Sequence, residues 1–385
     1  MSVLRKDFLL TIRDIDISYR AGADAVLLIA AILEPQRLGE LYKRTLELGM
    51  TALVEVHDSG ELNKVKQSGI RPELMGINAR NLRNFQVDML GALKLRQEID
   101  WECDVVFESG IFAPAQAAHA AASGFSGVLV GEAAVKIPEL PASLSHGLEK
   151  PGDFPQAGHE FWERLLGLRR GAWLSAGTGG KRAGRPLVKV CGITRRTDAE
   201  HAAAAGADLL GFVFADSPRK ASLALLEELR DLDVLKVAVV TGDPDEMLRE
   251  AWRRGLIDVF QYHGDESPEE CQERKLPFYK ALTLRSEAQV DDIMSYASPR
   301  VLVDAYSSKA RGGTGTSIEA DLVTRAAVQK PLWLAGGLNP ENIASKLESF
   351  SPELVDVSSG LEAAPGEKDH EKVTRFFQEI KRAGI

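Results

Sequence analysis

Residues 187–194 read Leu-Val-Lys-Val-Cys-Gly-Ile-Thr, an apolar run that leads directly into a cysteine and a glycine turn. Seven more runs rich in Val, Ile and Leu follow, at 209–214, 235–240, 259–262, 278–283, 301–304, 332–334 and 354–357. Parallel strands covered by helices are buried on both faces and therefore read as continuous apolar runs. Eight is the number of strands that closes a parallel barrel, so residues 187–385 are predicted to form a complete (β/α)8 barrel.

The N-terminal part of the chain has the same kind of pattern. Its six apolar runs lie at 3–9, 25–33, 52–56, 75–78, 105–108 and 128–130. Residues 1–149 are therefore predicted to form a second α/β barrel that is incomplete, with about six strands. Residues 150–186 break the pattern with Pro- and Gly-rich ends, which is typical of a linker. Within them, residues 161–170 have the spacing of a short amphipathic helix, which we expect to pack against a barrel end.

Composition limits the classes of function. The chain has 47 basic and 56 acidic residues and a net charge of -9, which argues against nucleic acid or an anionic membrane as a partner. The three cysteines, at 103, 191 and 271, have no paired spacing, so neither disulfides nor a structural zinc site is predicted. Residues 5–7 are charged where a signal peptide would be apolar, and the run 25–33 is too short to span a bilayer. We therefore expect a cytoplasmic protein.

Polar residues and glycines follow nearly every run of the predicted complete barrel. In such a barrel, the residues just past the carboxyl ends of the strands converge on one mouth. Gly336, Gly337 and Gly360 follow the last two runs, where backbone N–H groups and a helix N-terminus can hold a phosphate. One glycine turn alone would be an ordinary turn, but two at the final strands indicate a phosphorylated small-molecule substrate.

Cys191 and Asp304 are the candidate acid and base of this mouth. A strand cysteine is usually an inert core residue, and an aspartate after a strand often only caps the next helix. Cys191, however, is followed at once by a Gly-Ile-Thr turn, which places its sulfur at the mouth. The two residues together can transfer protons without a metal or a cofactor. Neither His263 nor any other histidine has metal-ligand spacing, so no metal is predicted.

These segments resemble the phosphoribosylanthranilate isomerase family in order and spacing. The matching segments are 189–194 (KVCGIT), 211–214 with 217–219 (GFVF, SPR), 261–267 (QYHGDES), 302–304 with the glycine run 312–315, 335–342 (AGGLNPEN) and 355–360 (VDVSSG). The resemblance implies a cofactor-free Amadori rearrangement in tryptophan biosynthesis. It makes Cys191 the general base that takes the C2 proton of the opened sugar, and Asp304 the general acid that protonates the furanose oxygen.

The resemblance also implies how the substrate is held. Arg219, His263 and Asp356 would contact it, with Arg219 and Asp356 on the anthranilate moiety. The backbone of Gly336, Gly337, Ser359 and Gly360 would bind the phosphate. One departure from the family pattern is Val-Val-Thr-Gly at 239–242, where an aromatic residue and an asparagine are more usual. A sugar-phosphate epimerase is the alternative enzyme, but that class uses a metal or paired carboxylates where this chain has Cys191 and Asp304.

The N-terminal part resembles indole-3-glycerol-phosphate synthase, and a synthase followed by an isomerase is a known fusion. The matching segments are 3–8 (VLRKDF), 53–56 (LVEV), 76–80 (GINAR), 108–111 (ESGI) and 128–133 (VLVGEA). By this resemblance Lys6 and Glu55 would be acid/base groups. Asn78, Arg80 and Glu108 would bind the substrate, and Ser109, Gly110 and Gly131 would lie near the phosphate. A set of structural ion pairs is the alternative explanation for any one pair of these residues.

The resemblance places Lys6 on the third strand of the synthase family, so two strands and the first-strand Lys and Glu of that family have no counterpart here. Six parallel strands cannot close an eight-stranded barrel, and both edges are expected to stay open. We expect no ring closure or decarboxylation by this half alone. Either the true start of the protein lies upstream of residue 1, or another chain supplies the missing part, or the first half is a relic. The alternative function is that of an isomerase whose first half is a docking or stabilising module.

Overall fold

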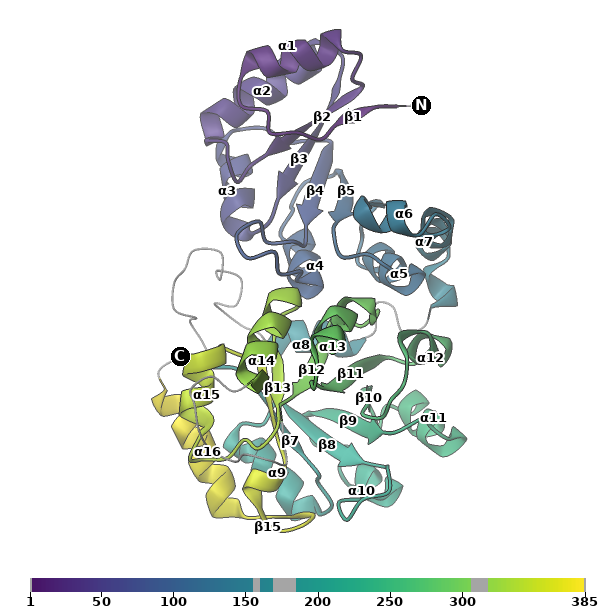
Figure 1. Ribbon diagram of the computed structural model, residues 1–385, viewed down its shortest axis with the longest axis vertical. Helices are drawn as coiled ribbons and strands as arrows, with labels where there is room; N and C mark the ends of the chain where they lie inside the picture. The colour runs from purple at the N-terminus through teal and green to yellow at the C-terminus, as the bar shows by residue number, and fades with distance from the viewer. Residues whose placement is uncertain (1, 155–159, 169–184, 306–317, 384–385) are drawn as a thin grey trace. The chain divides into compact units, whose positions relative to one another are not determined.

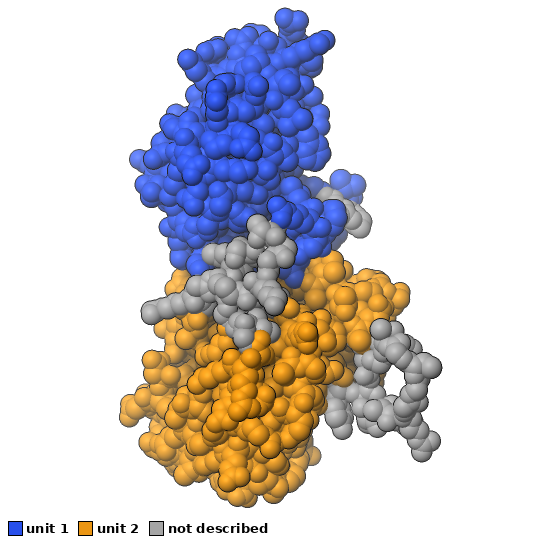
Figure 2. Space-filling model, turned by 90° about the vertical axis from the view of Figure 1, so that its left-hand side faces the viewer, with its two compact units in different colours: residues 1–154 blue, residues 155–385 orange. Residues whose placement is uncertain are grey.

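The chain divides into two compact units, Met1–Phe154 and Pro155–Ile385, called here unit 1 and unit 2 and coloured separately in Figure 2. The structure, a computed structural model, describes residues 2–154, 160–168, 185–305 and 318–383. The glycine run 312–315 and the last two residues of the helix expected at 161–170 lie outside these ranges. No helix in the described ranges is both long enough and apolar enough to cross a membrane.

Unit 2 contains a closed barrel of eight parallel strands (Figure 1), which confirms the prediction for residues 187–385. Its strands, in chain order, are β7 (Leu187–Cys191), β8 (Leu209–Val213), β9 (Leu235–Val240), β10 (Val259–Tyr262), β11 (Phe278–Thr283), β12 (Val301–Asp304), β13 (Trp333–Ala335) and β14 (Leu354–Val357). Each strand pairs in parallel with the next, and β14 pairs with β7 to close the barrel. The pairing of Asp356 with Lys189 across this closing seam places two charged side chains on neighbouring strands.

The strands of unit 2 alternate with helices that cover the outside of the barrel. These helices are α9 (Arg196–Ala205), α10 (Leu223–Glu228), α11 (Glu246–Arg253), α12 (Pro268–Glu273), α13 (Glu287–Asp291), α14 (Ile318–Gln329), α15 (Ile343–Phe350) and α16 (His370–Arg382). Helix α16 shows why they pack: Val373, Phe376, Phe377 and Ile380 recur at helical spacing and are all buried. A short hairpin, β15 (Glu362–Ala364) and β16 (Glu367–Lys368), lies between β14 and α16.

Unit 1 contains one sheet of six parallel strands in sequential order, which confirms the predicted strand number. The strands are β1 (Leu4–Arg5), β2 (Ala25–Ile29), β3 (Thr51–Val56), β4 (Leu74–Asn78), β5 (Asp104–Glu108) and β6 (Gly127–Leu129). The helices are α1 (Ile12–Arg20), α2 (Pro35–Glu47), α3 (Ser59–Gln67), α4 (Met89–Gln97), α5 (Pro114–Ala122), α6 (Glu132–Lys136) and α7 (Leu140–Glu149). In the described part of the chain, β1 and β6 have no strand on their outer side, so both edges are open.

The segment interpreted as a linker contains a structured part. Residues Glu160–Leu168 form helix α8, which belongs to unit 2. Phe161, Trp162 and Leu165 are buried, and the Trp162 ring lies 6.1 Å from that of Trp333, the first residue of β13. The helix therefore covers the amino-terminal end of the barrel, as expected for the amphipathic helix within residues 150–186.

Candidate active site

A cavity of about 340 Å³ opens at the carboxyl ends of the strands of unit 2. Seven of the residues predicted for this mouth line it: Cys191, Arg219, His263, Asp304, Gly336, Gly337 and Asp356. Ser359 lines it as well, so of the residues predicted for this half only Gly360 does not. These residues come from six different strand ends or the loops after them, and the closed barrel brings them together because its strands are parallel.

Cys191 is the last residue of β7 and is buried. The turn after it depends on Gly192, which has a φ of 78° and whose missing Cβ would lie 2.9 Å from Arg219 Cδ and 3.0 Å from Ser358 Oγ. Burial raises the pKa of the Cys191 thiol above its ordinary value, while the nearby ammonium of Lys189 acts in the opposite direction. The thiol is thus held against the cavity by a turn that only glycine can form there.

Lys189 lies in the barrel interior beneath this turn and was not singled out from the sequence. Its Nζ lies 2.6 Å from Asp356 Oδ2 and donates to Gln261 Oε1 at 2.7 Å. Tyr279 donates its hydroxyl to the same oxygen of Gln261 at 2.8 Å. Although burial opposes it, the Asp356 carboxylate raises the pKa of Lys189, so the lysine is a fixed cation. The sequence shows Lys189 only as a charged residue inside an otherwise apolar run, which does not identify its partner.

Asp356 takes part in this ion pair and also reaches the cavity. Its side chain is almost fully buried, and its second oxygen, Oδ1, has no hydrogen-bond partner among the described residues. A buried carboxylate oxygen without a donor is rare in native structures. Because Asp356 also lines the cavity, its carboxylate lies beside any molecule bound there.

Asp304 ends β12, and β13 and β14 separate that strand from β7. Asp304 Oδ2 lies 3.5 Å from His263 Nε2, and His263 Nδ1 lies 3.1 Å from Gln261 Nε2. His263 therefore contacts the candidate acid. Asp304 and Cys191 line the same cavity, and two strands lie between their own.

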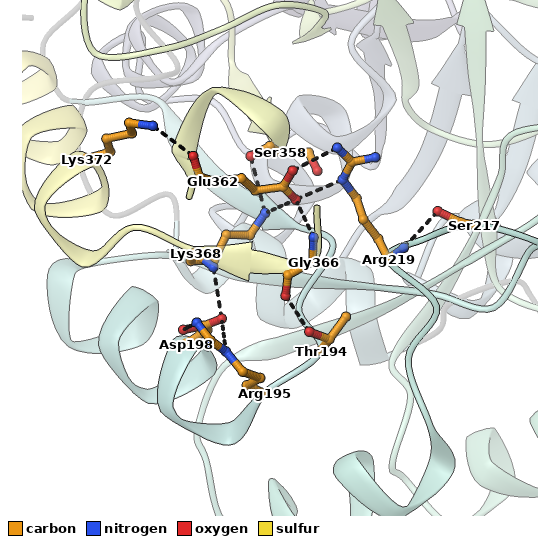
Figure 3. A network of polar contacts seen from close by, with 10 residues as sticks. All are labelled: Thr194, Arg195, Asp198, Ser217, Arg219, Ser358, Glu362, Gly366, Lys368 and Lys372. Atoms are coloured by element: carbon orange, nitrogen blue, oxygen red, sulfur yellow. Dashed lines mark hydrogen bonds and ion pairs between the residues drawn. The ribbon is translucent and has the colours of Figure 1, made fainter. Parts of the chain in front are cut away.

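Arg219 follows β8 and is held by a residue that sequence reasoning missed. Its Nε and Nη2 donate to the two carboxylate oxygens of Glu362 at 2.8 and 2.7 Å (Figure 3). Lys368 Nζ lies 3.1 Å from one of these oxygens. Both partners stand on the β15–β16 hairpin, beyond the last strand of the barrel, where no strand-end pattern points to them.

The loops predicted to bind a phosphate contain glycines at positions where a side chain would be strained or would clash. Gly336 and Gly337 have φ values of 102° and 62°, which a residue with a side chain rarely adopts. The side chain of Asn342 ties this loop by donating to the Gly337 carbonyl at 2.9 Å. Gly360 has a different reason to be glycine, because a Cβ there would lie 1.9 Å from the Leu338 carbonyl oxygen. Close packing of the two loops, and not the cavity, thus requires the lack of a side chain at 360.

In unit 1, Lys6 joins two buried carboxylates at the ends of β3 and β5. Its Nζ lies 3.1 Å from Glu55 Oε2 and 2.9 Å from Glu108 Oε2. Burial and the nearby Glu55 raise the pKa of Glu108 to about 7. Gly76 makes room for this carboxylate, since a Cβ there would lie 2.1 Å from Glu108 Oε1. Lys6 itself is 43% exposed, whereas the side chains of Glu55 and Glu108 are buried.

A cavity of about 500 Å³ adjoins this group. The predicted residues that line it are Lys6, Arg80, Glu108, Ser109, Gly110 and Gly131. Glu55 lies behind Lys6, and Asn78 uses its side-chain oxygen to accept the backbone N–H of Arg80 at 3.0 Å. Ser109 and Gly110 both have positive φ values, 68° and 75°, so the chain turns sharply at the cavity wall.

Comparison with known families divides the chain in the same place as the fold. The family model for "Indole-3-glycerol phosphate synthase" matches residues 1–146, and that for "N-(5'phosphoribosyl)anthranilate (PRA) isomerase" matches residues 188–379. The second match includes every residue that lines the cavity of unit 2.

Individual relatives agree with these matches. An "N-(5'-phosphoribosyl)anthranilate isomerase" of Geobacter metallireducens is 41% identical over 199 residues, which are 50% of this chain and 98% of the relative. "Tryptophan biosynthesis protein TRP1" of Phytophthora nicotianae is 30% identical over 444 residues, with 99% of this chain and 79% of the relative covered. The "Multifunctional tryptophan biosynthesis protein" of Schizosaccharomyces pombe is 30% identical over 413 residues, and the chain spans 50% of its length.

Proposed function

This chain belongs to the N-(5'-phosphoribosyl)anthranilate isomerase family, and we propose that unit 2 isomerises N-(5-phosphoribosyl)anthranilate to the carboxyphenylamino-deoxyribulose phosphate in tryptophan biosynthesis. The observation that carries the proposal is that Cys191, Asp304 and Arg219 line one cavity at the mouth of a closed barrel. A thiol, a carboxylic acid and a guanidinium at one site supply the base, the acid and the anion-binding group that the rearrangement requires.

Two side chains transfer the protons of this reaction. Asp304 gives a proton to the furanose oxygen as the bond from that oxygen to C1 breaks, and the nitrogen lone pair forms a C1=N bond. The thiolate of Cys191 then takes the proton from C2, and the electrons of that C–H bond form the enol–amine. Return of a proton from the Cys191 thiol to C1, with loss of the C2 hydroxyl proton to the Asp304 carboxylate, gives the ketone and restores both side chains. Each side-chain transfer typically accounts for a factor of ~10² to 10⁴ in rate.

The remaining residues of the cavity hold the substrate. Arg219 binds the carboxylate of the anthranilate ring, and the unpaired Oδ1 of Asp356 accepts the N–H of its amine. The phosphate lies against the backbone of Gly336 and Gly337 and the loop that contains Ser359, where free N–H groups favour an anion. His263 contacts Asp304 and orients it toward the sugar.

For unit 1, the proposal is a synthase-type site that is incomplete in the described sheet. Lys6 is the acid group between Glu55 and Glu108, and a carboxylate with a pKa near 7 can exchange protons at neutral pH. The open outer edges of β1 and β6 leave backbone donors and acceptors for two more parallel strands. The partner is a βα-containing segment that supplies those strands, and the resulting barrel performs ring closure and decarboxylation.

The second candidate function is that of an isomerase whose unit 1 only docks or stabilises. The same open edges favour it, together with exposed apolar side chains close to them: Val3, Phe8 and Leu10 near β1, and Val135 and Ile137 near β6. Exposed apolar side chains of this kind can bind a partner protein even if unit 1 has no catalytic activity.

One experiment separates these functions. Purified chain is given N-(5-phosphoribosyl)anthranilate, whose fluorescence is lost on isomerisation, and in a second assay the isomerised product, with indole formation as the readout. We expect turnover of the first compound and none of the second. No turnover of either would refute the isomerase. Indole formed only after adding the N-terminal segment of a complete synthase would support the docking of a strand-supplying partner.

A further inference from the structure

Glu362 engages one whole edge of the Arg219 guanidinium. Two parallel N–H···O bonds, from Nε and Nη2, meet its two oxygens, the bidentate geometry in which an arginine is most firmly oriented (Figure 3). The Arg219 side chain, which lines the cavity, is 27% exposed and that of Glu362 is 6% exposed, so the ion pair is largely shielded from solvent. The third nitrogen, Nη1, makes no hydrogen bond with a described residue.

The carboxylate of Glu362 is itself held from several directions. Its Oε1 accepts from Lys368 Nζ at 3.1 Å and from the Gly366 backbone N–H at 3.3 Å. Lys368 Nζ also donates to the Ser358 carbonyl at 3.2 Å, which links the hairpin to the end of β14. Burial opposes ionisation, but Arg219 and Lys368 lower the pKa of Glu362, so it remains an anion.

The hairpin that carries Glu362 is anchored to the first strand of the barrel. Thr194, in the turn after β7, donates its hydroxyl to the Gly366 carbonyl. Gly366 has a φ of 82°, and a Cβ there would lie 3.2 Å from the Pro218 carbonyl and 3.3 Å from Thr194 Cγ2. The backbone N–H of Lys368 donates to Asp198 on α9 at 3.0 Å. The loops after β7, β8 and β14 are therefore joined at this hairpin.

We propose that Glu362 is a positioning residue of the isomerase, which fixes Arg219 so that Nη1 faces the carboxylate of the substrate's aromatic ring. This rests on the proposed function. A free arginine side chain would have to be ordered each time the substrate binds, and its guanidinium could approach the carboxylate in several orientations. With the Nε hydrogen and one Nη2 hydrogen already occupied, the three remaining N–H groups, two on Nη1 and one on Nη2, are presented to the anion in a fixed orientation. Glu362 also neutralises one of two neighbouring cations, Arg219 and the buried Lys368.

A purely structural ion pair is the competing explanation, and a double-mutant cycle distinguishes the two. The variants are Glu362→Gln, which keeps the shape but removes the charge, Arg219→Ala, and the double variant. Glu367→Gln is the matched control, because Glu367 is on the same hairpin but pairs with the exposed Arg195. Circular dichroism verifies that each variant is folded, and kcat and KM are measured with N-(5-phosphoribosyl)anthranilate.

We expect Glu362→Gln to raise KM at least tenfold and to change kcat less than threefold, because the interaction it organises is made in both the bound substrate and the transition state. In the Arg219→Ala background the same change should alter kcat/KM less than threefold, and Glu367→Gln should resemble the unchanged chain. An equal loss with and without Arg219, or a loss in kcat alone, would overturn the proposal.

Two further outcomes are covered by the design. If Glu362→Gln does not fold, Glu362→Asp is decisive, since it keeps the charge but shortens the reach: a raised KM supports positioning and an unchanged KM contradicts it. If the unchanged chain shows no turnover, the isomerase assignment fails. In that case Glu362 has no substrate-holding arginine to position, so the positioning proposal fails together with the isomerase assignment. If only the positioning proposal is wrong, the unchanged chain still turns over the substrate.

Discussion

Lys189 and Asp356 form a buried ion pair across the seam at which the barrel closes. The distance from Lys189 Nζ to Asp356 Oδ2 is 2.6 Å, and the two residues are register partners on β7 and β14. The lysine is fully buried, directly below the turn that carries Cys191. One cation thus serves both the closing strand pair and the electrostatic environment of the candidate base.

Replacing this lysine alone should destabilise unit 2. Lys189→Met leaves the Asp356 carboxylate in the interior without its cation, and breaking a buried pair in this way typically costs about 3–5 kcal/mol. The double variant Lys189→Met with Asp356→Asn removes both charges and should lose less. Urea unfolding followed by circular dichroism measures the difference. A single variant as stable as the double would show that the pair contributes nothing.

The rate of isomerisation should increase with pH across the neutral range. Burial raises the pKa of Cys191, and only the thiolate can take the C2 proton, so the active fraction grows as pH rises toward that pKa. The check is kcat/KM measured from about pH 6 to about pH 9, a range that includes the ordinary thiol value of about 8.5. A rate that falls steadily over this range would exclude the thiolate as the base.

Helix α8 should be important for the stability of the isomerase unit. Trp162 is 2% exposed and packs near Trp333, and truncating a buried tryptophan typically costs about 3–5 kcal/mol. Trp162→Ala should therefore unfold at lower urea concentration. Leu168→Ala is the matched control, because Leu168 is on the same helix but 46% exposed, and we expect its effect to stay within about 0.5 kcal/mol. Equal effects of the two variants would refute the packing role.

The stability of unit 1 should fall as pH rises through neutrality. The pKa of Glu108 is raised from 4.5 to about 7, so the folded state binds the proton more tightly than the unfolded state. The stabilisation is complete below pH 4.5 and is lost as pH rises through about 7, with a size of about 3 kcal/mol. Calorimetry of the full chain between these values measures it. Glu108→Gln should flatten this dependence, and an unchanged slope in that variant would show that another group causes it.

The strands of both units could be predicted because each is a continuous apolar run. Eight runs predicted the closed barrel of unit 2, and six runs predicted the open sheet of unit 1. Residues at strand ends, such as Cys191 and Asp304, could be predicted to meet because parallel strands share one mouth. Lys189 was missed because a charged residue inside an apolar run has no pattern of its own. Its function depends on Asp356, 167 positions later.

The role of Glu362 and the particular strand that α8 packs against could not be predicted for a related reason. Glu362 follows the last strand in a short hairpin, and only the closed barrel brings that hairpin beside Arg219, 143 positions earlier in the chain. Likewise, Trp162 packs near Trp333 on β13, and no local spacing pairs the helix with that strand. Contacts of this kind arise from tertiary structure, which local spacing does not encode.

The central claim is that Cys191 and Asp304 transfer the protons of the isomerisation, and the most direct test is the kcat of Cys191→Ala and Asp304→Ala with N-(5-phosphoribosyl)anthranilate. Both variants should keep the circular dichroism of the unchanged chain. Each should lose turnover by a factor of ~10² to 10⁴ or more, because a positioned proton-transfer group is removed. Full turnover by either folded variant would contradict the account.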